Sequence, residues 1–138
     1  MSKVAVKVGS NVVIYEDVIF YHPNNITFGN NVSNHPYYYI QTSGDLSFGS
    51  NVSIAQNVTI MTEKHQYNSL DSIIKDQEMD RRAMDIRGNI WIGAKSTILL
   101  GTTILSGAII GAHSLVNRDV EANEIVGGTP IKTLKWRG

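Results

Sequence analysis

Residues 92 to 116 read Ile92-Gly-Ala-Lys-Ser-Thr-Ile-Leu-Leu-Gly-Thr-Thr-Ile-Leu-Ser-Gly-Ala-Ile-Ile-Gly-Ala-His-Ser-Leu-Val116, and they repeat every six residues. Each hexad starts with an aliphatic residue and has a small or β-branched residue four positions later. The aliphatic positions are Ile92, Ile98, Ile104, Ile110 and Val116, and the small ones are Ser96, Thr102, Ala108, Ser114 and Val120. A period of six fits neither an α-helix nor a simple strand. It is typical of short strands that turn corners at fixed intervals and stack as a β-solenoid.

A longer period of 20 residues is superimposed on the hexads. Val6-Lys-Val-Gly-Ser-Asn-Val, Ile26-Thr-Phe-Gly-Asn-Asn-Val and Leu46-Ser-Phe-Gly-Ser-Asn-Val begin 20 residues apart, and Ile90-Trp-Ile-Gly-Ala-Lys-Ser resembles a fourth copy 44 residues after the third. Three hexads and a two-residue bulge would make one triangular coil, so we predict about five coils. An ordinary sandwich of short strands is the alternative, but it has no reason to keep the six-residue phase.

Each residue type then has an expected place in the coil. The aliphatic residues point inward, the small ones turn the corners, and Asn11, Asn31 and Asn51 stand where the corner backbone needs a positive φ. We therefore predict an all-β fold, a parallel β-helix formed by residues 1–138 as a single domain. The period does not determine the hand of the helix.

The repeat breaks in a segment dense in charges of both signs, from Glu63 to Arg87. We predict an extended loop over about residues 66–88, after the third coil, with a possible short helix between Ser69 and Met84. A long loop in a compact repeat protein usually has a function, although a solvated bulge is the alternative. A short C-terminal tail is expected over about residues 128–138.

Composition limits the classes of function. The formal net charge is zero, which argues against a nucleic-acid partner. No apolar run is long enough to span a membrane and no signal-peptide core begins the sequence, so we expect a cytoplasmic protein. The absence of cysteine excludes disulfides, thiolate catalysis and Cys-zinc sites. Between Gly88 and Asn117 only Lys95 is charged, and such uncharged faces favour packing against copies of the chain, with a homotrimer as the natural expectation.

Four motifs in a fixed order carry a resemblance to a known family. They are Asn51-Val-Ser-Ile-Ala-Gln-Asn-Val-Thr-Ile-Met-Thr-Glu-Lys-His65, Ile90-Trp-Ile-Gly-Ala94, Gly111-Ala-His-Ser-Leu-Val-Asn-Arg-Asp119 and Gly127-Gly-Thr-Pro-Ile-Lys132. Together they resemble the hexapeptide-repeat acetyltransferases, above all the galactoside/maltose O-acetyltransferase branch. The resemblance implies a left-handed parallel β-helix, a trimer with active sites between subunits, and acetyl-CoA as the acyl donor, with no metal.

Acetyl transfer to a hydroxyl needs a base, and histidine suits this role because its ordinary pKa lies near neutral pH. His65 stands where the loop is expected to leave the solenoid, and it aligns with the catalytic histidine of the family. An exposed loop histidine is its alternative reading. His22 precedes Pro23 in a polar turn and reads as structural, and His113 reads as a surface residue. No activated nucleophile is evident, so we expect direct attack by the acceptor on the thioester.

By the resemblance, the backbone N–H of Ala94 stabilises the oxyanion. The expected contacts of the cofactor are Trp91, Gly93, Ala94, Gly111, Ala112, Asn117, Arg118, Lys132 and Lys135. The small residues would expose a groove for the pantetheine arm, and the cations would bind the phosphates. A basic solvated tail, Lys135 and Arg137, is the alternative for the last positions.

The acceptor side departs from the family. His35-Pro-Tyr-Tyr-Tyr-Ile-Gln-Thr-Ser43 stands where the sugar-acetylating members carry Asn and Asp residues that hold the sugar. Tyrosines here could stack on a sugar ring or pack between subunits, and Glu63 could orient His65. The expected acceptor-side residues are His35, Tyr37, Tyr39, Asn57 and Glu63.

The resulting hypothesis is an acetyl-CoA-dependent O-acetyltransferase acting on a sugar or a glycan building block. The first alternative is N-acetylation of a nucleotide-linked amino sugar, or acetylation of a xenobiotic. A γ-type carbonic anhydrase shares the solenoid, but it needs closely spaced zinc-binding histidines and the four here are scattered. A non-catalytic solenoid is the remaining alternative.

Overall fold

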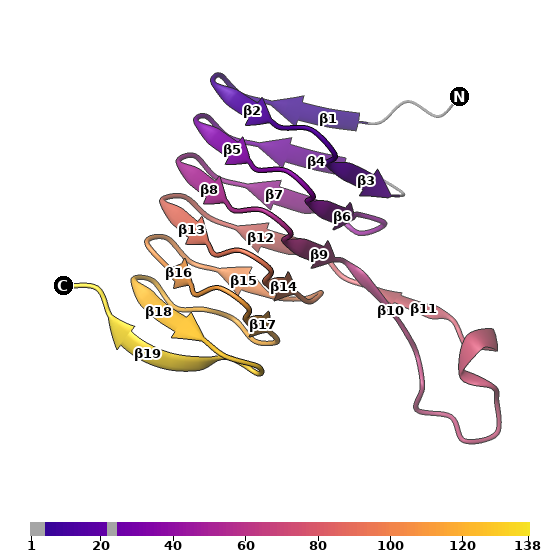
Figure 1. Ribbon diagram of the computed structural model, residues 1–138. Coiled ribbons are helices and arrows are strands. Elements are labelled where there is room, and N and C mark those ends of the chain that lie inside the picture. The colour runs from indigo at the N-terminus through magenta and orange to yellow at the C-terminus, as the bar shows by residue number, and fades with distance from the viewer. Residues whose placement is uncertain (1–4, 22–24) are drawn as a thin grey trace.

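The computed structural model describes residues 5–21 and 25–138, and in them the predicted solenoid is confirmed (Figure 1). Short strands stack in parallel to form three faces of a prism. The β1 face contains β1 (Ala5–Val8), β4 (Asn25–Phe28), β7 (Leu46–Phe48), β12 (Met84–Ile86) and β15 (Thr103–Ile104). The β2 face contains β2 (Val12–Ile14), β5 (Val32–Asn34), β8 (Val52–Ile54), β13 (Ile90–Ile92), β16 (Ile109–Ile110) and β18 (Glu124–Gly127). The β3 face contains β3 (Ile19–Tyr21), β6 (Tyr39–Gln41), β9 (Thr59–Met61), β14 (Thr97–Ile98) and β17 (Leu115–Val116).

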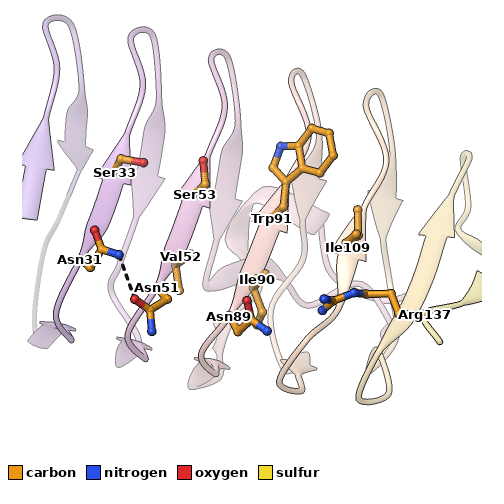
Figure 2. A pocket seen from close by; sticks show the side chains of 10 residues that line it. All are labelled: Asn31, Ser33, Asn51, Val52, Ser53, Asn89, Ile90, Trp91, Ile109 and Arg137. Atoms are coloured by element: carbon orange, nitrogen blue, oxygen red, sulfur yellow. Dashed lines mark hydrogen bonds between the residues drawn. The ribbon is translucent and has the colours of Figure 1, made fainter.

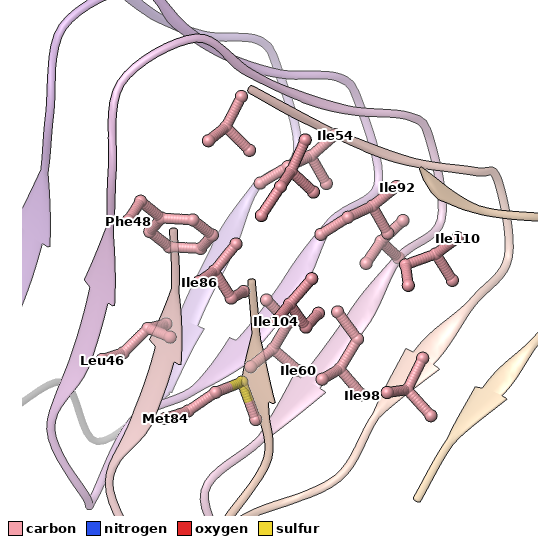
Figure 3. Close-up of a cluster of buried hydrophobic side chains, with 14 of the residues drawn as sticks. Leu46, Phe48, Ile54, Ile60, Met84, Ile86, Ile92, Ile98, Ile104 and Ile110 are labelled. Carbon is pink, nitrogen blue, oxygen red and sulfur yellow. The ribbon is translucent and has the colours of Figure 1, made fainter. Parts of the chain in front are cut away.

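The inward positions form the core, as the hexads predict. The side chains of Ile92, Ile98, Ile104, Ile110 and Val116 are fully buried. Figure 3 shows the four isoleucines stacked with their counterparts in neighbouring coils. Burying one such side chain contributes about 1.5–3 kcal/mol before the entropy cost of ordering it. The small corner residues, from Ser96 to Val120, are buried as well. A continuous apolar interior therefore holds the coils in register.

Two corners of the prism use left-handed backbone in successive coils. The predicted positive φ is confirmed at Asn11, Asn31 and Asn51, which have values of 55°, 58° and 63°. Their side chains form a ladder, because the amide of each donates to the amide oxygen of the next at 2.9 Å. The second such corner was not expected, and it consists of Asp17, Tyr37, Asn57, Lys95 and His113.

The fourth coil begins at Met84, so the prediction that Ile90 starts the fourth copy of the 20-residue repeat is wrong. Met84 pairs with Leu46, 38 residues earlier, whereas Ile90 pairs with Val52 on the β2 face. The reason is that each face has the same inward-residue pattern, so a hexad motif alone does not reveal the face on which it lies. The predicted end of the loop near residue 88 is consequently too late.

The inserted segment is a β-hairpin. Its strands are β10 (Glu63–His65) and β11 (Met79–Arg81), which pair antiparallel, and the connecting loop contains a short 3₁₀ helix, η1 (Ile74–Asp76). The hairpin projects away from the prism (Figure 1) and exposes apolar side chains near its tip, of which Leu70 is 98% exposed. No helix in the described part of the chain has the length and apolar character needed to cross a membrane.

The predicted tail closes the C-terminal end of the β2 face. A sixth, partial coil begins with Val120, which bridges to Ile104, and continues into β18. Strand β19 (Lys132–Trp136) then folds back antiparallel on β18. The last parallel edge of this face is thereby covered, which protects it from pairing with another chain.

Candidate functional site

His65 lies at the base of the hairpin. Its strand, β10, follows directly after Thr62, the last buried residue of the third coil, and His65 itself is exposed and pairs with Met79 of β11. An exposed imidazole on a short strand next to a rigid coil can reach a bound substrate and exchange protons with it.

Glu63 makes its hydrogen bonds away from the imidazole. Its Oε2 accepts a hydrogen bond from the Ser43 hydroxyl at 2.6 Å and one from Arg81 Nε at 3.2 Å. Glu63 and His65 are two residues apart on one strand and therefore point to the same side of the hairpin. An orienting effect of Glu63 on His65 would thus act through the hairpin backbone rather than through a carboxylate–imidazole bond.

Trp91 stands on the outside of the β2 face, 55% exposed, in a groove of about 450 Å³ (Figure 2). The groove runs across the strands between the outward row of side chains and the asparagine corner. Its lining consists of Asn31, Ser33, Asn51, Val52, Ser53, Asn89, Ile90, Trp91, Ile109 and Arg137. The groove is suited to an elongated polar ligand with an anionic group, because it offers an aromatic wall, hydroxyl and amide groups, and one guanidinium.

Most of this lining was not expected from the sequence, although a signal for it exists. Ser33, Ser53, Trp91 and Ile109 occupy equivalent positions on successive strands. The 20-residue period relates Ser33 to Ser53. Once the fourth coil is placed at Met84, Trp91 and Ile109 fall in the same row. Arg137 is held over the groove, because its Nη1 donates to the Gly107 carbonyl at 2.9 Å.

Two glycine-alanine pairs, Gly93-Ala94 and Gly111-Ala112, lie at the corner between the β2 and β3 faces. The N–H groups of Gly93 and Gly111 donate to the carbonyls of Ile110 and Val126, both at 2.8 Å, so these groups are used within the solenoid. The Ala94 carbonyl accepts from His113 N–H at 2.8 Å. Within residues 5–21 and 25–138 the Ala94 N–H donates to no backbone carbonyl.

Arg118 is committed to an ion pair. Its Nη2 lies 3.0 Å from Oε1 of the buried Glu124, and Thr133 also donates to this carboxylate. Burial alone raises the pKa of Glu124, but hydrogen bonds from Arg118, Thr133 and the Glu121 N–H outweigh it and hold the pKa below its ordinary value. The other polar residues expected to contact the cofactor are exposed, namely Asn117, Lys132 and Lys135.

The expected acceptor residues sit mainly in the second coil. The His35 ring stacks on Tyr15, with centroids 5.0 Å apart, and Tyr39 stacks on Tyr21 at 6.4 Å. Tyr37 is 62% exposed at the left-handed corner, one coil before Asn57. His22 lies outside the described residues.

The structure gathers some of these residues and separates others. Trp91 lines the groove on the β2 face, whereas His65 projects from the corner after the β3 face and does not line it. A second groove, of about 550 Å³, lies on the β1 face among polar residues such as Lys7 and Asp85, and it contains none of the predicted site residues. The described residues include no cluster of three His, Asp or Glu side chains arranged to bind a metal ion.

Comparison with known proteins shows that a solved acetyltransferase has the same fold as this chain. No protein-family model matches the chain. The galactoside O-acetyltransferase of Escherichia coli is 31% identical over 128 residues, which cover 93% of this chain and 62% of that protein. A solved galactoside acetyltransferase in complex with coenzyme A is 29% identical, with a TM-score of 0.86 over 94% of this chain and 64% of that chain.

AntD, an N-acyltransferase from Bacillus cereus solved with dTDP and 3-hydroxybutyryl-CoA, also has a TM-score of 0.86, over 97% of this chain and 73% of that chain. At 18% identity this likeness shows the fold alone. The chain spans less than two thirds of the Escherichia coli enzyme. By fold and by the order of its sequence motifs, the chain therefore resembles the hexapeptide-repeat acetyltransferases with their left-handed β-helix, as its sequence predicts.

Proposed function

We propose that the chain is an acetyl-CoA-dependent O-acetyltransferase that acetylates a hydroxyl of a sugar or glycan building block, with His65 as the general base. The observation that carries this proposal is the similarity to a galactoside O-acetyltransferase along 93% of the chain. In this chain an exposed histidine, His65, stands beside a rigid coil. The donor is proposed because the solved galactoside acetyltransferase contains coenzyme A.

In the proposed reaction the neutral imidazole of His65 takes the proton of the acceptor hydroxyl while its oxygen attacks the thioester carbonyl. The Ala94 N–H donates to the oxyanion of the tetrahedral intermediate. Collapse of the intermediate breaks the carbon–sulfur bond, and the imidazolium returns its proton to the coenzyme A sulfur. General-base catalysis of this kind contributes about 10²–10⁴ in rate.

For the donor, we propose that Trp91, Gly93, Ala94, Gly111 and Ala112 border the pantetheine arm. Lys132, Lys135 and Asn117 are the proposed partners of the phosphates. Arg118 is less available than the sequence suggests, because Glu124 already occupies its guanidinium. We therefore expect the two lysines to contribute more than Arg118 to coenzyme A affinity.

We also propose a homotrimer with sites between subunits. The separation of His65 from the Trp91 groove in one chain supports this, because a neighbouring chain would have to complete the site. The β3 face offers a contact surface, since its outward side chains are uncharged and largely apolar. They include Ile19, Tyr21, Tyr39, Met61, Leu99 and Leu115.

Replacing His65 with alanine tests the catalytic proposal. We expect kcat for acetyl transfer to fall by about a hundredfold or more, while the thermal midpoint stays unchanged because His65 is exposed. Coenzyme A release is measured with a thiol reagent, and Lys64→Ala, one residue away and also exposed, serves as the matched control. A His65→Ala variant as active as the parent would remove the mechanism.

N-acetylation is the second candidate. It is favoured by the segment from His35 to Ser43, which departs from the sugar-acetylating pattern. A panel of galactosides, amino sugars, nucleotide-linked amino sugars and chloramphenicol is tested for coenzyme A release, and the acetylated product is identified. An ester product supports O-acetylation and an amide product supports N-acetylation.

A further inference from the structure

The base of the hairpin is anchored to the solenoid by a continuous set of hydrogen bonds. A two-stranded ribbon alone is marginally stable in water, and β10 and β11 pair over only three residues each. The position of any side chain on the ribbon therefore depends on how its base is attached.

The attachment starts inside the prism. Gln41 and Thr62 are 3% and 0% exposed. The Gln41 side-chain oxygen accepts a hydrogen bond from Thr62 N–H at 3.2 Å, and its Nε2 donates to the Ser43 hydroxyl at 2.7 Å. These bonds fix Ser43 of the second coil against the last residue of the third coil before the hairpin begins.

The attachment continues onto the hairpin through Glu63. The Ser43 hydroxyl donates to Glu63 Oε2, and Arg81 Nε donates to the same oxygen. Glu63 and Arg81 are also directly paired across the two strands. One carboxylate thus joins the second coil and both strands of the hairpin at its base, and its side chain is only 16% exposed.

We propose that Glu63, held by Ser43 and Arg81, is a positioning residue that sets the location of His65 relative to the solenoid. This inference rests on the proposed role of His65 as the base. His65 is two residues beyond Glu63 on the same side of β10, so a rotation of the ribbon about its base would displace the imidazole. Misplacing a catalytic group by about 1 Å can cost of the order of 10² in rate.

A carboxylate suits this position because it accepts from a hydroxyl and a guanidinium at once, and charge-assisted bonds of this kind are short and strong. Glutamine at position 63 keeps an acceptor oxygen, whereas alanine removes both bonds. The two variants therefore form a graded series, and Ser43→Ala removes the hydroxyl that links the carboxylate to the second coil.

The experiment measures kcat and KM for both substrates in Glu63→Ala, Glu63→Gln and Ser43→Ala, with circular dichroism and thermal midpoints as checks of folding. Asp80→Asn is the matched control, since Asp80 pairs with Arg82 on the same hairpin and does not join the attachment. We expect Glu63→Ala to lower kcat about tenfold or more with KM for acetyl-CoA little changed. Glu63→Gln should recover part of this loss, and Asp80→Asn should match the parent.

A double-mutant cycle decides whether the effect passes through His65. If Glu63 acts by placing His65, Glu63→Ala lowers kcat in the parent and has no further effect in His65→Ala. An equal loss in both backgrounds would mean a merely structural role and would overturn the inference. Unchanged kcat in Glu63→Ala and Ser43→Ala, with His65→Ala inactive, would overturn it while leaving the proposed function intact. A fully active His65→Ala variant would overturn both.

Discussion

Asn34 is a polar residue in an aliphatic column. It lies between Ile14 and Ile54 in the strand register, is fully buried, and its side-chain amide has no hydrogen-bond partner among residues 5–21 and 25–138. A buried amide without partners costs about 1–3 kcal/mol.

Asn34→Ile should therefore raise the free energy of unfolding, by about 1 kcal/mol or more. Urea unfolding of the variant and the parent, followed by circular dichroism, measures the change. A less stable variant with an unchanged m-value would contradict this account.

Two glycines at one corner differ in the space around them. A Cβ on Gly93 would lie 2.6 Å from the Ala112 backbone nitrogen, whereas on Gly111 the nearest atom would be 3.2 Å away. Overpacking a rigid site typically costs about 1–3 kcal/mol. We expect Gly93→Ala to be clearly less stable than Gly111→Ala in thermal unfolding, and equal midpoints would show that the coils can separate locally.

At the scale of the element, the C-terminal strand depends on an ionised Glu124. The pKa of Glu124 is lowered in the folded chain, so near and below the ordinary glutamate value the unfolded chain binds more protons than the folded one. The stabilisation is therefore complete above the unfolded pKa and is lost as the pH falls through the folded pKa.

Glu124→Gln should remove this part of the pH dependence. Urea midpoints of the parent and the variant, measured from neutral pH down to about pH 3, should converge as the pH falls below the ordinary glutamate value of about 4.3. Parallel curves across this range would mean that another carboxylate accounts for the acid sensitivity.

The same scale shows how far the sequence could predict the structure. The inward aliphatic residues and the left-handed asparagines follow from the hexads, because stacking is a local rule repeated in every coil. The face on which Ile90 lies could not be predicted from the hexads, because hexads on all three faces have the same pattern of inward residues. The hairpin pairing of Glu63 with Arg81 joins residues of a segment without periodicity, and only the three-dimensional arrangement shows it.

At the scale of the whole molecule, the site needs more than one chain in our proposal. The motifs predicted Trp91 and His65 one by one, but the groove depends on the asparagine corner, two serines and the returning tail. Their convergence comes from four successive coils and from Arg137, directly after β19, so no single motif could reveal it.

Charges placed on the β3 face test the assembly. Leu99→Glu combined with Leu115→Glu should convert a trimer into monomers of 15.2 kDa and abolish activity, because each copy would bring like charges into an apolar contact. Light scattering after gel filtration gives the mass. Thr103→Glu, on the β1 face near Asp85, is the matched control, and a monomeric parent would contradict the proposed trimer.

The hairpin is inserted at a corner, and the fourth coil still docks on the third with Met84 beside Leu46, in the register used by the coils before it. The scaffold and the ribbon are therefore separable modules. Ribbons of other lengths and compositions could be exchanged at residues 66–78, beyond Glu63, His65 and Arg81, without repacking the interior, so that new acceptor preferences could be engineered on an unaltered frame.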